Sequence, residues 1–189
     1  RQEPAYAEEL AVIMRWGFDY MQADDGGAVY LRLSTRPLAQ PHCTIEQEYH
    51  GGVIAGAYWR ARPATPDAGS IIYMGAVAPE AEAAHAKLTG SGYSPGLLAV
   101  TSPDRLYEDW RKCEPGSHIA SLLVILTPGA PLVTVLDGHP ATLSWMAGVH
   151  GHRNRALGVD RFGQCGDLPG LYHEYGLDSE SICAAYRDV

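Results

Sequence analysis

The sequence of 189 residues contains no long hydrophobic run, and no apolar stretch approaches the roughly 20 residues that a membrane-spanning helix requires. Basic residues are also few. Lysine and arginine number 14 against 22 aspartates and glutamates, so the formal net charge is −8. An acidic surface repels phosphate-rich partners. The sequence therefore predicts neither a membrane protein nor a protein that binds nucleic acid.

Cysteine is scarce and scattered. The four cysteines form no Cys-x-x-Cys pair, which argues against a zinc site; they are Cys43, Cys113, Cys165 and Cys183. A chain of this length buries a core without disulfides, so we expect reduced thiols and a cytoplasmic protein. His150 and His152 have no evident third ligand nearby, and no metal site is predicted.

Residues 1–37 have the pattern of the tail of a preceding domain. Apolar residues at helical spacing predict a helix over about residues 4–21, and alternation over 29–33 predicts a strand. The chain starts at Arg1, already within the helical pattern, so we expect a longer parent protein. Residues 38–50 are interpreted as a linker and residues 51–189 as the main domain.

Short apolar runs alternate with helical patterns in the main domain. This order is typical of the α/β class, and we expect a three-layer α/β/α fold with a mostly parallel five-stranded sheet. Residues 132–136 are all apolar or β-branched, which predicts an interior strand. The expected strands cover 53–60, 70–74, 97–100, 132–136 and 153–157. The expected helices start at 79 and 103 or cover 118–126, 140–149, 168–175 and 179–187.

Three residues are candidate ligands at the rim formed by the loops after the parallel strands, where α/β sheets bind ligands. His139 precedes an expected helix start, which favours anions. Asp137 beside it is a candidate acid or base. Arg36 leaves the early strand near the same rim. For each of them a structural role is the favoured alternative: a loop histidine, a turn aspartate and a solvated linker arginine.

Two segments carry a resemblance to a known family. Residues 158–167, GVDRFGQCGD, with Leu171-Tyr172 and Tyr175-Gly176-Leu177 after them, resemble the end of transketolase-superfamily enzymes. That end has a Phe-Gly loop, Leu-Tyr, an aromatic-Gly turn and a last helix. Residues 30–37, YLRLSTRP, resemble the closing strand of the family's pyrimidine-binding domain. The resemblance covers nearly the whole chain and is greatest to the homodimeric pyruvate dehydrogenase decarboxylating component.

The resemblance implies a role by location. The chain is expected to be the carboxy-terminal part of a thiamine-diphosphate-dependent 2-oxo acid (pyruvate) dehydrogenase component. Thiamine diphosphate and magnesium would be bound by other domains of the parent, and neither by this chain. The family's Gly-Asp-Gly…Asn magnesium motif and its catalytic glutamate are absent. We therefore expect no catalytic residue and no activity in the chain alone.

The expected partners are the rest of its own chain, a second subunit of a homodimer and a lipoyl-bearing acyltransferase that docks on the parent. Asp160, Arg161, Phe162 and Gly163 are interpreted as an interface loop, because a loop with an aromatic between glycines needs a packed partner to hold it. Two alternatives remain open for the function. One is the same domain of a transketolase that moves two-carbon units between sugar phosphates, and the other is a non-catalytic ligand-binding or assembly module.

Overall fold

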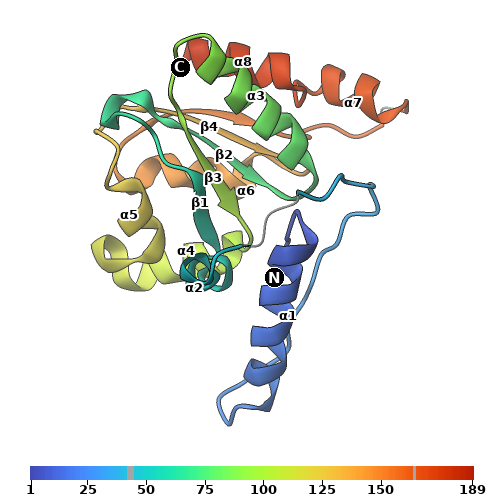
Figure 1. Ribbon diagram of the computed structural model, residues 1–189, viewed down its shortest axis with the longest axis vertical. Helices are drawn as coiled ribbons and strands as arrows, with labels where there is room; N and C mark the ends of the chain where they lie inside the picture. The colour runs from blue at the N-terminus through green and yellow to red at the C-terminus, as the bar shows by residue number, and fades with distance from the viewer. Residues whose placement is uncertain (42–44, 164) are drawn as a thin grey trace.

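A five-stranded sheet with the order β1-β3-β2-β4-β5 organises the chain in the computed structural model (Figure 1). The structure describes residues 1–41, 45–163 and 165–189, so Cys43 and Gln164 lie outside the described residues. The strands are β1 (Ala57–Ala61), β2 (Ser70–Met74), β3 (Gly96–Val100), β4 (Pro131–Leu136) and β5 (Arg153–Leu157). Only β1 is antiparallel to its neighbour among these strands. The expected mostly parallel sheet is confirmed.

Helices cover both faces of the sheet, as the sequence pattern predicts (Figure 1). On one face lie α3 (Ala78–Gly90) and α8 (Ser179–Asp188), and on the other α4 (Pro103–Cys113), α5 (His118–Leu123) and α6 (Ala141–Ser144). Three further helices are α1 (Ala7–Gln22), α2 (Gln47–Ala55) and α7 (Leu168–Glu174). The three-layer α/β/α fold class is therefore confirmed.

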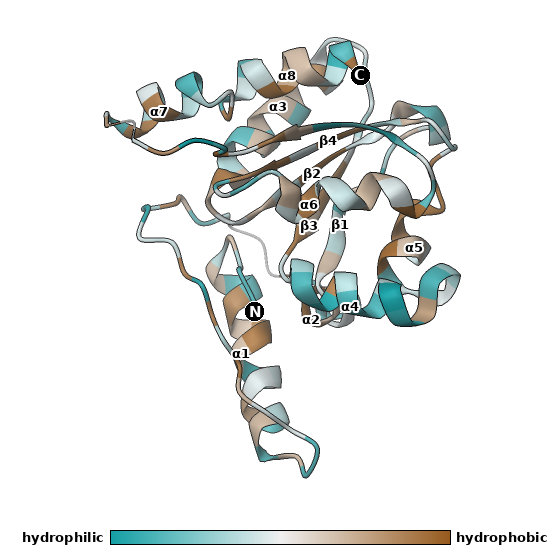
Figure 2. Cartoon of the chain, turned by 180° about the vertical axis from the view of Figure 1, so that it is seen from behind, coloured by the Kyte–Doolittle hydropathy of each residue, from teal (hydrophilic) through white to brown (hydrophobic). Residues whose placement is uncertain are grey.

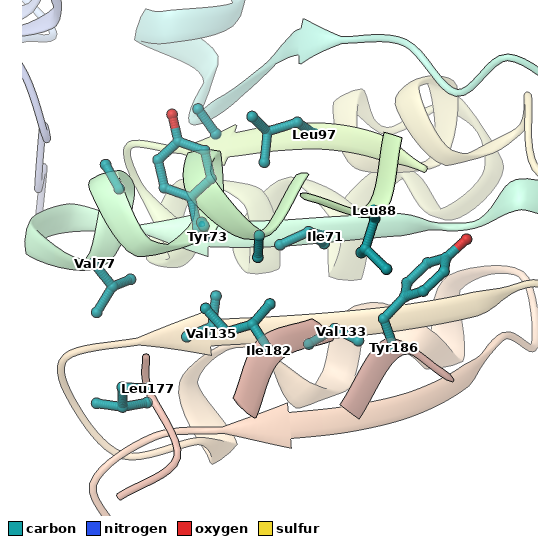
Figure 3. Packing of buried hydrophobic residues seen from close by; sticks show 14 of the residues in the cluster. Ile71, Tyr73, Val77, Leu88, Leu97, Val133, Val135, Leu177, Ile182 and Tyr186 are labelled. Atoms are coloured by element: carbon teal, nitrogen blue, oxygen red, sulfur yellow. The ribbon is translucent and has the colours of Figure 1, made fainter. Parts of the chain in front are cut away.

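Successive strand residues supply the two faces with separate cores. Ile71 points into the layer of α3 and α8, whereas Ile72 points into the layer of α4, α5 and α6. Figure 3 shows the first core, where Leu88 of α3 and Ile182 of α8 gather with the strand residues. Figure 2 shows hydrophobic residues concentrated in the strands between the helical layers. Burying each such side chain stabilises the fold by about 1.5–3 kcal/mol.

The predicted interior strand is confirmed. β4 lies between β2 and β5, and its residues 132–136 are all buried. The predicted start of α4 is confirmed as well. The Ser102 hydroxyl caps this helix by accepting a hydrogen bond from the Arg105 amide, and Pro103 occupies its first turn.

Two predicted strands are wrong in part or in whole. The expected strand over 53–60 is a helix up to Ala55, and β1 begins only at Ala57. Gly56 separates the two elements at φ +122°, where an added Cβ would lie 2.6 Å from the Ser102 carbonyl oxygen. Glycine is the residue that allows this sharp exit from a helix. The expected strand over 29–33 is not a strand of the sheet. Among the described residues it forms a single bridge, between Leu31 and Gln2.

Helix α1 and the extended return segment that follows it project from the sheet domain (Figure 1). The base of α1 joins the core, since Ile13 is fully buried. The rest of the hairpin exposes large apolar side chains: Met14, Phe18, Met21, Tyr30 and Leu33. Within the described residues, no helix combines the length and apolarity needed to cross a bilayer. The three described cysteines are all free thiols.

Candidate functional site

The rim at the carboxyl ends of the four parallel strands is covered by the chain's own first residues. The Glu3 amide donates to the Thr101 carbonyl at 2.7 Å, and the Ser102 hydroxyl donates to the Arg1 carbonyl at 2.5 Å. Thr101 and Ser102 directly follow β3. An amino-terminal segment therefore occupies the place where α/β sheets commonly receive ligands.

Glu3 fixes this segment to the return strand. Its buried carboxylate pairs with the guanidinium of Arg1 and, at 2.9 Å, with that of Arg32. Arg32 also reaches the Asp137 carbonyl oxygen at 3.5 Å. One carboxylate between two arginines thus links residues 1–3, the return segment and the loop after β4. The sequence pattern did not mark Glu3 as important.

Arg36, a predicted rim ligand, is held by groups of the protein itself. It donates two hydrogen bonds to the Glu80 carboxylate, at 2.7 and 2.9 Å, and one to the Ala76 carbonyl at 2.7 Å. Its guanidinium lies 5.0 Å from the ring centre of Tyr172. The pKa of Arg36 is raised, first by its hydrogen bonds with Glu80. A forked ion pair of this kind locks the chain between the first helix and the main domain.

We expect Arg36→Ala to lower the free energy of unfolding by about 2 kcal/mol, because it leaves a half-buried Glu80 carboxylate without its partner. Urea denaturation of both single variants and of the double variant with Glu80→Ala would measure the coupling. The matched control is Arg161→Ala. Its ion pair with Glu174 is more than half exposed, and its loss is expected to cost less than about 1 kcal/mol. Additive effects of the Arg36 and Glu80 changes would contradict the locking role.

The other two rim candidates have structural partners. The Tyr172 hydroxyl donates a long hydrogen bond to Asp137 at 3.5 Å, and burial is the main cause that raises the pKa of Tyr172 to about 12. The exposed His139 accepts a hydrogen bond from the Ala141 amide through Nδ1 at 3.2 Å. Both contacts support the favoured alternative, a role in shaping the loop. The structure brings Asp137 and Arg36 together around one side chain, that of Tyr172.

The expected helix over 140–149 is much shorter than predicted. Only Ala141–Ser144 is α-helical, and a 3-10 turn continues from Trp145 to Val149. A single helical turn has few aligned peptide dipoles, so it attracts anions weakly. At this end of the helix, the Trp145 indole donates a hydrogen bond to the Thr142 carbonyl at 3.0 Å. The anion-binding interpretation of His139 depended on a longer helix.

The Phe-Gly loop presents a bare aromatic to solvent. Phe162 is 105% exposed, and Gly163 follows it at φ +106°. Its neighbour Arg161 pairs with Glu174 at 2.7 Å and lies over the Tyr175 ring. The Tyr175 hydroxyl in turn donates to the Arg161 carbonyl at 2.9 Å. The base of the loop is therefore fixed to α7, while at its tip Phe162 is fully exposed among the described residues.

Among the residues that the structure describes, the most deeply buried charged side chain is Glu9, which the sequence did not identify. It is 1% exposed and accepts hydrogen bonds from the amides of Ala5 and Tyr6, at 2.6 and 3.2 Å, and from the Tyr58 hydroxyl at 2.7 Å. Burial raises its pKa, while these three donors act in the opposite direction. Glu9 thereby joins α1 to β1. Acidic residues are common in the first turn of a helix, so the position of Glu9 in the sequence did not indicate that it is buried.

Metal ligands are not assembled by the described residues. Across 1–41, 45–163 and 165–189, no group of three or more histidines, cysteines or acids is placed to hold an ion. His150 instead contacts the Ala120 carbonyl oxygen at 2.9 Å. His152 is buried, and burial followed by the nearby His150 lowers its pKa. The two imidazoles are not the oxygen ligands that magnesium prefers.

The known proteins that match this chain in sequence include transketolases. Two transketolases of Cupriavidus necator, one encoded on a plasmid and one on the chromosome, are each 40% identical to this chain over 63 residues. The matched segment is 33% of this chain and 9% of each relative. No family model matches the sequence.

Solved structures match over almost the entire chain. A transketolase variant from Pichia stipitis superposes with a TM-score of 0.72 at 17% identity, covering 99% of this chain and 24% of that one. A split-gene transketolase described as an inactive beta4 tetramer gives a TM-score of 0.64 at 17% identity, with 99% and 55% covered. The chain thus spans about a quarter of the Pichia enzyme. Its fold is that of the transketolase carboxy-terminal domain.

Proposed function

We propose that this chain is the carboxy-terminal domain of a thiamine-diphosphate-dependent transketolase that transfers two-carbon units between sugar phosphates. The supporting observation is the agreement of two comparisons. The fold matches a transketolase over 99% of the chain, and a 63-residue segment is 40% identical to two other transketolases. The pyruvate dehydrogenase component favoured by the sequence finds no support among these relatives, and neither does a lipoyl-bearing acyltransferase as partner.

Within the parent, we assign this domain to assembly. The rim loops are already filled by residues 1–3, and the nearby arginines Arg32 and Arg36 are paired with carboxylates. Thiamine diphosphate and magnesium would then be held by parts of the parent outside this chain, where the cofactor supplies the carbanion chemistry. The exposed apolar side of the α1 hairpin, with Met14 and Phe18, would pack against the remainder of the pyrimidine-binding domain.

Self-association is part of the proposal. The split-gene relative is described as a tetramer of one subunit type, which supports contacts between copies. The residues Asp160 to Gly163 remain the proposed interface loop, since Phe162 is a fully exposed aromatic. In the assembled parent, a second subunit or the preceding domain would cover it.

The substrate class is tested with the protein that carries this chain as its carboxy-terminal part. Supplied with thiamine diphosphate and magnesium, it is expected to transfer a two-carbon unit from a ketose phosphate to an aldose phosphate. Product sugar phosphates would be measured by coupled enzymes. Pyruvate-dependent reduction of ferricyanide without sugar-phosphate transfer would overturn the transketolase assignment. The chain of 189 residues alone is expected to give background in both assays. Turnover by it would contradict the assembly role.

A further inference from the structure

A polar groove follows the outer edge of β5. Its volume is about 460 Å³, and its floor is the stretch from Asn154 to Gly158. The other lining residues are Pro140, Asp160, Arg161, Glu174 and Tyr175. The hydrogen bonds described above fix Arg161 and Tyr175 to each other, so this part of the lining is built before any partner arrives. The groove runs along a strand rather than across the rim.

The backbone of this strand is open on the groove side. β5 is the last strand of the sheet, and it pairs in parallel with β4 alone. In such a pairing, alternate N–H and C=O groups point away from the neighbour. Among the described residues, the backbone of 153–157 makes no hydrogen bond beyond this ladder. The free groups form a row that an extended chain can continue.

The open edge is basic, although the chain as a whole carries a charge of −8. Arg153 and Arg155 are both exposed and, being two residues apart, lie on the same face of the sheet. Arg153 uses one donor on the Gly129 carbonyl. The described residues offer no carboxylate to Arg155. In the groove itself Arg161 is paired with Glu174, and Asp160 is a further lining residue. The positive charge available to a partner therefore lies on the strand, at Arg153 and Arg155, and it complements an extended segment that brings carboxylates.

A second copy of β5 fits this edge poorly. Two copies of β5 related by a two-fold axis would pair antiparallel. Most of the strand is paired when that axis passes through Arg155 or through Asn154. The first register sets Arg155 opposite Arg155, and the second sets Arg153 opposite Arg155. Like charges directly opposite one another destabilise a strand pair. An acidic segment from another protein removes this repulsion and replaces it with attraction.

We propose that this groove binds an extended acidic segment of a partner protein, which adds a strand to the sheet beside β5 and pairs a carboxylate with Arg155. Backbone hydrogen bonds along residues 154–158 supply affinity, and the arginines select the charge of the segment. Edge arginines can also serve only to prevent aggregation. If Arg153 and Arg155 serve only to prevent aggregation, no extended peptide should bind saturably.

The probe is a fluorescent heptapeptide of alternating threonine and glutamate, titrated against the 189-residue chain by anisotropy. Saturable binding is expected, together with slower hydrogen exchange of amides in 153–158. A matched peptide of alternating threonine and lysine is expected to bind at least roughly tenfold more weakly. Arg155→Glu should reverse this preference. Arg62→Glu, an exposed change just after the opposite edge strand β1, should leave it unaltered.

Backbone pairing is tested separately. N-methylation of alternate residues in the acidic peptide removes its donors, and we expect binding to weaken by about tenfold or more. The proposal is overturned if the acidic peptide shows no saturable binding. It is also overturned if Arg155→Glu and N-methylation both leave binding unchanged. Exchange protection of 153–157 that grows with chain concentration in the absence of peptide would assign the edge to a second copy instead.

Discussion

Replacing Glu9 by alanine is expected to lower the free energy of unfolding by about 4 kcal/mol. The carboxylate is 1% exposed, and it is the shared acceptor of the Ala5 and Tyr6 amides and the Tyr58 hydroxyl. Each buried donor left without an acceptor costs about 1–3 kcal/mol. The loss would separate the start of α1 from β1. Urea denaturation followed by tryptophan fluorescence measures the change.

Glu9→Gln is the matched control. The amide oxygen can replace Oε2, which accepts from the Ala5 and Tyr6 amides, and the amide NH2 can donate to the Tyr58 hydroxyl in place of Oε1. We therefore expect a loss of only about 1 kcal/mol. Equal losses for the alanine and glutamine variants would show that the charge, rather than the hydrogen bonds, holds α1 in place.

Comparing the unchanged protein with Glu9→Gln isolates the part of the pH dependence of stability that comes from Glu9. Burial raises its folded-state pKa above the ordinary value of 4.5. Between these two pKa values the folded carboxyl keeps a proton that the unfolded chain has released. The contribution of Glu9 to stability is therefore complete below pH 4.5 and declines as pH rises towards the folded-state pKa. Glu9→Gln should lack this decline, whereas an identical pH profile in both proteins would contradict the raised pKa.

The sheet was predictable where the strand is a continuous apolar run. Residues 70–74 and 132–136 are buried on both faces, so their composition alone indicates a central strand. The segment around Val53 and Ile54 misled the prediction because apolar, β-branched residues there lie on a short helix. Only Gly56, with its positive φ, marks the boundary, and a glycine has several structural meanings.

The topology of the rim was predictable, but the segment that covers it was not foreseen. Parallel strands place their following loops at one edge, so the positions of Asp137 and His139 follow from topology. The partners of the charged residues do not. Arg36 finds Glu80, 44 positions further along the chain, and Glu9 finds Tyr58, 49 positions away. Each acid stands in the first turn of a helix, where an exposed carboxylate is ordinary. Sequence spacing carries no signal for pairs formed by tertiary packing.

Gly69→Ala is expected to destabilise the chain by about 4 kcal/mol, because two separate costs add. Gly69 has φ +65°, and an added Cβ would lie 2.0 Å from the Pro131 carbonyl oxygen. This is the point where the beginnings of three strands meet, since Gly69 precedes β2, contacts the start of β4 and accepts a hydrogen bond from Gly96 at the start of β3. Thermal and urea unfolding of the variant measure the loss.

Gly129→Ala separates the two costs. Gly129 also has a positive φ, +80°, but an added Cβ would meet no heavy atom within 4 Å. It should therefore cost only the backbone term of about 1–2 kcal/mol. The difference between the variants is the cost of moving backbone in the sheet, because the Pro131 carbonyl cannot yield without shifting β4. If both substitutions cost the same, the junction of β2 and β4 tolerates displacement. The close approach at Gly69 would then not be what fixes the register of these central strands.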